Sequence, residues 1–405
     1  ASLRQEKAVG SHLVLKAGGA VRVDIQGGDI ATFEGNVGWR WDEWLGGSIE
    51  VTPSTISAIS GSAEASILQH KKIGSDFELQ PGSGLLLEID SGADLAGQAV
   101  LGDVAWRWQD WLGGSVTLGA GSTFGGVQGV AEARLLADKP AGDALVLKSG
   151  GNLHTELASS QPTTFGGELD WQYEDWLAGR VTINNGSTLT NISGEANAHL
   201  RAEKPVGDGN FKLRSGGSPT VVFANSIPQT FHGHLNYGYQ DWLEGTVAVE
   251  PGSSLKSITA KGDASVLVDK AVGGKGFRVR AGSRAEISVA ANKFDGLTGD
   301  VKWGWQDWVE GSVHVEGSNL DNVSGEAKAQ IIGDKKLGSK ITLKPGGSAE
   351  VTLQEGDITA WGGKVKVQYE DLLLGALAIE NKGPIDSVTG EIDARLLRDW
   401  DIGGD

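Results

Sequence analysis

The residues of this chain best suited to binding chemistry are acidic–tryptophan pairs that recur at wide intervals. A tryptophan ring offers an apolar face and a polar tip, and a neighbouring carboxylate accepts hydrogen bonds from hydroxyl groups, so such pairs suit sugar recognition. The competing interpretation, which we prefer, is that each tryptophan folds back and seals the end of a hairpin. The candidate glycan-binding residues are Trp44, Asp110, Trp111, Asp175, Trp176, Asp241, Trp242, Asp307 and Trp308.

Metal binding and catalysis are not expected from this sequence. Calcium takes about six to eight oxygen ligands, whereas each repeated turn offers only one or two carboxylates, so we expect these aspartates to cap turns. His232 and His234 share one strand face, but they occur in one copy only and no third ligand is evident. No nucleophile–base arrangement, carboxylate pair or phosphate loop stands out. We therefore predict a protein that is not an enzyme, with no catalytic residue, no metal site and no cofactor.

A second aromatic series occupies alternate positions of the longest segment in each copy. Val104, Trp106 and Trp108 share one face, and Trp303 and Trp305 repeat the pattern. Such a stripe could stack on sugars, but alternation with valine is typical of the buried face of a strand. We therefore predict that the stripe belongs to the core.

These motifs belong to an internal repeat that fills the chain. Trp44 recurs as tryptophan at positions 111, 176, 242 and 308 and as Leu372, at spacings of 64 to 67 residues. A fixed period of this kind indicates copies of one supersecondary unit, stacked or closed into a ring. We predict a single array over residues 1–405 with no internal linker. Its six tandem units are residues 11–74, 75–142, 143–207, 208–273, 274–338 and 339–403.

Each unit is predicted to hold four or five antiparallel strands joined by tight turns. The segment Glu195–Ala202 alternates strictly between polar and apolar residues, which is the signal of a half-buried strand. The Gly216-Gly217 step is either a hairpin or a bulge in one bent strand. Gly245 and Gly311, which follow the hairpin tryptophans, are expected to supply positive φ to the turns.

A sheet with one apolar face must cover that face, and without helices it must curl on itself or coil. We predict an all-β fold: a curled, closed or coiling β-sheet forming a shell, a barrel-like structure or a solenoid, with a propeller-like ring as the alternative. This architecture resembles that of bacterial toxin-encapsulating repeat shells and of lipid-conducting β-groove proteins, which also curl sheets from degenerate strand repeats. No motif of either class is present, so the resemblance assigns no residue.

The composition limits the partners and the compartment. The chain is tryptophan-rich and glycine-rich, with 14 Trp and 62 Gly, and its net charge of -17 argues against nucleic acid and anionic membranes as partners. It has no Cys, which excludes disulfides and thiolate metal sites. It also has no Met, as expected of a processed or excised chain. Together these features favour an exported bacterial protein, extracellular, at the cell surface or periplasmic.

The leading functional expectation is a non-catalytic structural or assembly module, such as a shell, rod or polymer subunit. Its partner would be itself, head to tail or by ring closure, or the remainder of a longer repeat chain. The first alternative is a multivalent carbohydrate-binding protein that uses the Asp–Trp turns, with a glycan as its partner. The second is a β-groove that carries apolar, lipid-like cargo.

Overall fold

The computed structural model describes residues 1–274, 276–319, 322–381 and 389–398, and in this part the protein is all-β as predicted. Strands account for 68% of the described residues and helix for 1%. The helix is a single 3-10 turn, η1 (Leu95–Gly97). The end of the last predicted repeat, residues 399–403, lies outside the described residues, as do residues 275, 320–321 and 382–388 within the last two repeats.

The chain divides into two compact units, and the division falls within strands β18 (Gly194–Leu200), β20 (Phe211–Ala224) and β21 (Ile227–Tyr239). The other strands of unit 1 are β1 (Lys7–Val9), β2 (Leu13–Leu15), β3 (Ala20–Gln26), β4 (Asp29–Trp41), β5 (Leu45–Ser54), β6 (Gly61–Ile67), β7 (Lys71–Ile73), β8 (Phe77–Leu79), β9 (Gly84–Ile89), β10 (Ala99–Trp108), β11 (Leu112–Leu118), β12 (Gly129–Leu135), β13 (Lys139–Pro140), β14 (Leu145–Leu147), β15 (Asn152–Ala158), β16 (Gln161–Tyr173) and β17 (Leu177–Ser187). The other strands of unit 2 are β19 (Lys204–Val206), β22 (Leu243–Ser253), β23 (Ala260–Val266), β24 (Lys270–Ala271), β25 (Phe277–Val279), β26 (Arg284–Ala290), β27 (Lys293–Trp305), β28 (Val309–Ser318), β29 (Gly325–Ile331), β30 (Lys335–Leu337), β31 (Ile341–Leu343), β32 (Ser348–Gln354), β33 (Asp357–Tyr369), β34 (Leu373–Asn381) and β35 (Thr389–Leu396).

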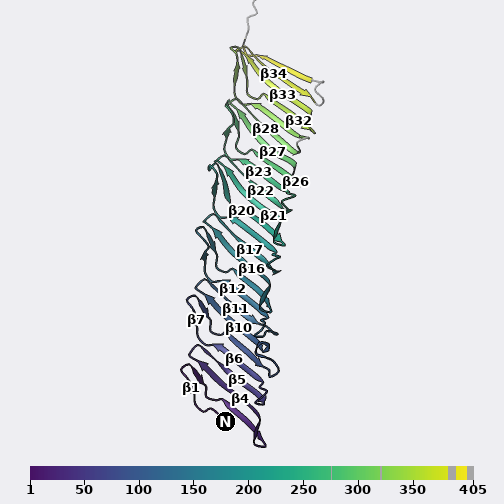
Figure 1. Ribbon diagram of the computed structural model, residues 1–405. Helices are drawn as coiled ribbons and strands as arrows, with labels where there is room; N and C mark the ends of the chain where they lie inside the picture. The colour runs from purple at the N-terminus through teal and green to yellow at the C-terminus, as the bar shows by residue number, and fades with distance from the viewer. Residues whose placement is uncertain (275, 320–321, 382–388, 399–405) are drawn as a thin grey trace, which may run out of the picture. The chain divides into compact units, whose positions relative to one another are not determined.

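Within each unit the long strands lie side by side in an open antiparallel sheet (Figure 1). In unit 1 the pairing runs β4, β5, β6, β9, β10, β11, β12, β15, β16, β17. In unit 2 it runs β22, β23, β26, β27, β28, β29, β32, β33, β34, β35. The sheet is not closed. Among the described strands of each unit, none returns to pair with the first, so neither unit is a closed barrel or a propeller-like ring.

The Gly-Gly step bends one strand and does not form a hairpin. Strands β14 and β15, which flank Gly150-Gly151, both pair with β16 on the same side, so together they act as one bent strand. At Gly216-Gly217 the strand β20 is not even interrupted. Positive φ at the bend, +98° at Gly150 and +90° at Gly216, explains why glycine stands there. Corresponding strands of successive copies within a unit therefore lie four strand positions apart, as β6 and β12 do.

The expectation that Gly245 and Gly311 supply positive φ is wrong. Positive φ falls earlier, on the first loop residue, for example 49° at Gln240. Gly245 and Gly311 instead lie within β22 and β28, directly opposite Tyr237 and Trp303. A Cβ at Gly311 would lie 2.5 Å from the Trp303 ring and 2.1 Å from a backbone carbonyl oxygen of the next strand. Glycine is required there because of this close approach, and its backbone freedom is not used.

Each unit is a single layer with one apolar and one polar face. The register puts Trp106, Gly114, Ala133 and Leu153 in one row across four strands. We call this side of the sheet the apolar face and the opposite side the polar face. Few apolar side chains of the described residues are fully buried, since nothing packs against this face within a unit. They are Ile67, Val100, Leu135, Ala178, Leu200 and Val266.

Candidate functional site

The predicted acidic–tryptophan residues all lie in three-residue hairpin loops between long strands. Trp44 ends the loop between β4 and β5, where Trp41 pairs with Leu45, and Trp111 ends the loop between β10 and β11. The corresponding loops of β16–β17, β21–β22 and β27–β28 hold the other predicted residues. Successive loops within a unit lie four strand spacings apart, about 19 Å. The structure therefore does not bring the pairs together into one site.

Within each loop the tryptophan folds back and the acidic residue points to solvent. The ring of Trp111 is half-buried, its Nε1 donates to Gln109 Oε1 over 3.0 Å, and Lys139 Nζ lies 4.9 Å from the ring centroid. Trp308 repeats this arrangement, donating to Gln306 Oε1 over 3.2 Å. Asp110, in contrast, is fully exposed. This geometry matches the preferred interpretation of a sealed hairpin end, and glycan binding at these loops stays a prediction.

The aromatic stripe is half-buried and packs sideways within the layer. Trp106 stacks on Phe77 of the neighbouring strand, with ring centroids 6.1 Å apart, and its ring covers Gly114 on the other side. Trp108 is 41% exposed. The prediction of a covered core was wrong in this respect, because within the unit only neighbouring strands contact these rings.

The apolar face is a continuous surface of the described residues that could bind another molecule. Its positions on β10 to β12 and β15 to β16 carry no charged side chain, and the hydroxyl residues among them are Thr155 and Tyr173. Several large side chains there are substantially exposed, including Leu153 at 44% and Ile287 at 45%. Contiguous apolar surface larger than a few hundred Å² is rare on soluble monomers and marks interaction sites. We therefore treat this face as the candidate site.

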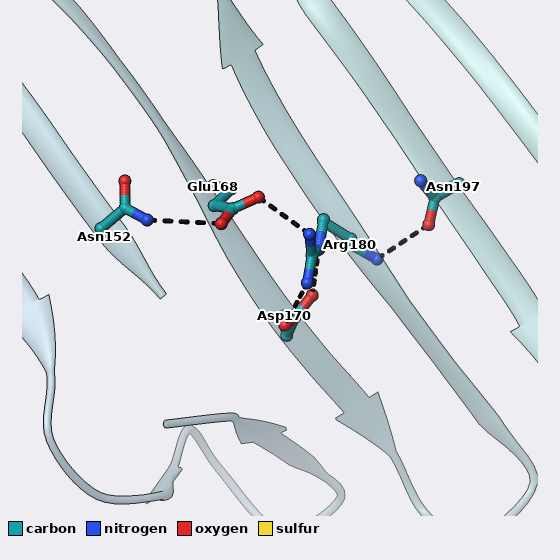
Figure 2. A network of polar contacts seen from close by, with 5 residues as sticks. All are labelled: Asn152, Glu168, Asp170, Arg180 and Asn197. Atoms are coloured by element: carbon teal, nitrogen blue, oxygen red, sulfur yellow. Dashed lines mark hydrogen bonds and ion pairs between the residues drawn. The ribbon is translucent and has the colours of Figure 1, made fainter. Parts of the chain in front are cut away.

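Charged side chains of the polar face pair with one another within the sheet, as Figure 2 shows for one cluster. Arg180 donates from Nε and Nη2 to the two carboxylate oxygens of Asp170, over 2.5 and 2.8 Å, and from Nη1 to Glu168 over 2.9 Å. Asn152 donates to the other Glu168 oxygen over 3.4 Å. The hydrogen bonds from Arg180 lower the pKa of Asp170 and outweigh partial burial, which acts in the opposite direction. This face is therefore suited to water.

A second recurring ion pair holds the bends. Asp269 accepts from Arg280 over 2.9 Å and from the Ala281 N–H over 2.8 Å, just before the bend in unit 2. The backbone hydrogen bond and then the guanidinium lower the pKa of Asp269. Asp138 makes the corresponding contacts to Lys148 and to the Ser149 N–H in unit 1. These carboxylates therefore stabilise the bends by joining the two segments of chain that meet there.

The histidine pair of β21 has no third metal ligand placed beside it among the described residues. His234 lies 3.2 Å from Ser218 Oγ through its Nδ1. Among the described residues no group of three or more His, Cys, Asp or Glu side chains is placed to hold a metal ion.

Sequence reasoning missed the lysine that opens the short strand of several copies. Lys71, Lys139, Lys270 and Lys335 each lie over the ring of a hairpin tryptophan. The signal was available, because a lysine stands at this position in five of the six copies, including Lys204, and Trp400 replaces it in the sixth. Its partner was not evident, since the tryptophan lies beside the neighbouring strand, at the other end of a β-hairpin.

No protein-family model and no curated protein sequence matches this chain. Among the described residues, no helix has the length and apolar character needed to cross a membrane. Any functional assignment therefore depends on the geometry of the two faces.

Proposed function

We propose that this protein holds long apolar molecules, such as the acyl chains of lipids, against the apolar face of its sheet. The observation that carries the proposal is that this face bears no charge on the strands described above and has no second layer over it within either unit. Burying apolar surface contributes about 25 cal/mol per Å². An aliphatic chain laid on exposed Leu, Ile, Val and Trp side chains would recover part of that energy.

The dimensions of the face suit an acyl chain. On β10 the apolar positions run from Gly102 to Trp108, and six residues of extended strand span about 20 Å. Half of a bilayer's hydrocarbon core is about 15 Å thick, which is the reach of one acyl chain. One strand is thus long enough to support one extended chain, and the apolar side chains continue onto the neighbouring strands.

A fluid chain fits this face better than a rigid second copy. Half-buried rings such as Trp106 and Trp303 are followed across the strands by a glycine and then an alanine. A folded partner would need to match this relief over many strands, whereas a flexible chain adapts to it. The six-repeat organisation in a coiling, open sheet, which we retain as part of the proposal, would present the same face again and again.

The assembly role and export expected from the sequence remain compatible with this proposal. A sheet that binds lipid on its apolar face can be one part of a longer exported repeat chain. The ion-paired polar face would then contact water. The acidic net charge favours solubility of such a carrier.

The test compares matched substitutions on the two faces of the same strands. The apolar-face variant combines Ile287→Gln, Val301→Gln and Val313→Gln, which replace side chains that are 45%, 37% and 37% exposed. The control combines Glu286→Gln, Lys302→Gln and Ser312→Gln, one position along on the polar face. Binding is measured with a fluorescent fatty-acyl probe below its micelle concentration, and bound lipid is identified by native mass spectrometry.

We expect the full chain to bind the probe, the apolar-face variant to bind about tenfold more weakly, and the control to bind unchanged. Both variants should keep the circular dichroism spectrum of a strand protein. Absence of binding by the full chain, or equal losses in both variants, would refute the proposal. A full chain that sediments as a dimer and becomes monomeric only in the apolar-face variant would instead show that a second copy covers the face.

A further inference from the structure

A lysine stands at one margin of the apolar face in successive copies within each unit. In unit 1 the ammonium groups of Lys71 and Lys139 each lie 4.9 Å from the centroid of a hairpin tryptophan ring. In unit 2 the corresponding distances for Lys270 and Lys335 are 5.5 and 5.4 Å. All four lysines are half-buried. The ring therefore fixes the position of each ammonium by a cation–π contact.

The register places these lysines on the apolar side of the sheet. Lys139 pairs with Leu147, which pairs with Trp171 of the aromatic stripe. Lys335 likewise pairs with Leu343, and Leu343 pairs with Val367. Cross-strand partners point to the same side of a sheet. The ammonium groups therefore lie at the margin of the apolar face that adjoins the hairpin loops.

These four ammonium groups have no acidic partner among the described residues. No carboxylate oxygen lies within 4.0 Å of any of them, although the chain has a large excess of acidic residues. Two of them donate to neutral acceptors: Lys270 to Gln240 Oε1 and Lys335 to Gln306 Oε1, each over 3.1 Å. Lysines at the bends differ, because Lys344 is paired with Asp334 over 2.6 Å.

We propose that Lys71, Lys139, Lys270 and Lys335 bind the acidic headgroup of an amphiphile whose chain lies on the apolar face. This inference rests on the proposed function and names its substrate class, an anionic phosphate or carboxylate on a long apolar chain. An ammonium has three donors, and at most one is used by glutamine, so donors remain for an anion. The cation–π contact holds the ammonium in place before the anion arrives, which reduces the entropy lost on binding.

The spacing predicts one headgroup for each lysine. Lys71 and Lys139 lie four strand spacings apart, about 19 Å. This distance exceeds the Debye length of about 8 Å at physiological salt. Each lysine therefore acts independently of the next one in its unit. With its anionic headgroup at one margin position, the amphiphile could extend its apolar chain along the strands toward the opposite margin of the apolar face.

The experiment measures headgroup preference with chains of one length. The probes are lysophosphatidate, oleate and uncharged monooleoylglycerol, all carrying an oleoyl chain and used below their micelle concentrations. The test variant changes the four margin lysines to glutamine. The control variant makes the same change of charge on the polar side of the sheet, with Lys72→Gln, Lys302→Gln, Lys336→Gln and Lys364→Gln, all at exposed positions.

We expect the full chain to bind the two anionic probes about fivefold more tightly than monooleoylglycerol at low salt, the upper end for a partly exposed charge pair. The preference should shrink at 0.15 M salt because exposed charges are screened, roughly over a Debye length of 8 Å. The margin variant should bind all three probes with the affinity that the full chain has for monooleoylglycerol. The control variant should keep the preference.

The outcomes separate the two proposals. If monooleoylglycerol binds but the anionic preference is absent, persists in the margin variant or disappears equally in the control, the headgroup inference is overturned and the proposed function stands. If none of the three probes binds, both are overturned. A preference for lysophosphatidate alone would assign a phosphate head, and equal preference for oleate would assign any anionic head.

Discussion

The contact between Gly245 and Tyr237 gives the sharpest test of the way the strands pack. A Cβ at Gly245 would lie 2.0 Å from the carbonyl oxygen of Asp263 and 2.6 Å from the Tyr237 hydroxyl oxygen. Contacts below 3.0 Å are essentially never made by real Cβ atoms, so the Asp263 carbonyl must move by at least 1.0 Å, the difference between the two distances. Movement of that size disturbs the ladder between β22 and β23.

We expect Gly245→Ala to destabilise unit 2 by about 2 kcal/mol. Overpacking costs about 1–3 kcal/mol, and a weakened ladder bond or the displaced hydrogen bond from Tyr237 to Asp263 adds about 1 kcal/mol. The lower entropy of alanine in the unfolded chain offsets about 0.5–1 kcal/mol. The matched control is Gly262→Ala on the next strand and the same face, where a Cβ would meet nothing within 4 Å. That change should stabilise by about 0.5 kcal/mol.

The assay is urea unfolding followed by tryptophan fluorescence, with hydrogen exchange of the β22 and β23 amides as the local readout. A Tyr237→Ala background separates the two contacts, because it removes the ring and leaves the carbonyl clash. If Gly245→Ala proves no more destabilising than Gly262→Ala, the close-approach reasoning is refuted. If its cost disappears entirely in the Tyr237→Ala background, the ring alone is responsible and the carbonyl argument fails.

Two further predictions concern buried hydrogen bonds and acid stability. Ser253, 2% exposed, donates to the Thr259 carbonyl and accepts from the Thr259 N–H, both over 3.0 Å, so Ser253→Ala should cost about 2 kcal/mol in urea unfolding. Exposed Ser257→Ala should change stability by less than about 0.5 kcal/mol, and equal effects would contradict the role of the buried hydroxyl. The folded-state pKa of Asp170 lies below its ordinary value of 3.8, so its stabilising contribution is complete above that pH and is lost as pH falls through the lowered pKa. Asp170→Asn should therefore cost about 1 kcal/mol at pH 7 and almost nothing at pH 2, and an unchanged pH profile of unfolding would contradict this.

The fold class was predictable because a strand imposes a two-residue period on its sequence. The alternation in Glu195–Ala202 and the absence of helical periodicity led directly to an all-β sheet. The path at Gly216-Gly217 was not predictable, because a glycine pair permits a hairpin and a bend equally well. Gly245 was misjudged for a related reason: sequence shows that a side chain is absent but not whether backbone geometry or a neighbouring ring requires its absence.

The candidate site was less accessible to sequence reasoning. A strand that alternates apolar and polar residues looks the same whether a second layer covers its apolar face or not, so the exposure of Leu153 and Trp108 could not be foreseen. The contact of Lys139 with Trp111 connects residues on different strands and depends on register. The hairpin loops were located correctly, since their acidic–tryptophan motif is distinctive. The structure nevertheless places successive loops four strand spacings apart.

A sheet one layer thick also has consequences for how cooperatively it unfolds. Within a unit each strand contacts its two neighbours and little else, so stability is approximately a sum of nearest-neighbour terms, as in a one-dimensional chain of coupled elements. Such a sheet should open locally, strand by strand, and disruption of one strand should leave distant strands folded. A ligand that lies across several strands would couple elements that otherwise open independently. The bound ligand would then stabilise all the strands that it contacts. A sheet with ligand bound should therefore resist proteolysis and mechanical unfolding better than an empty sheet.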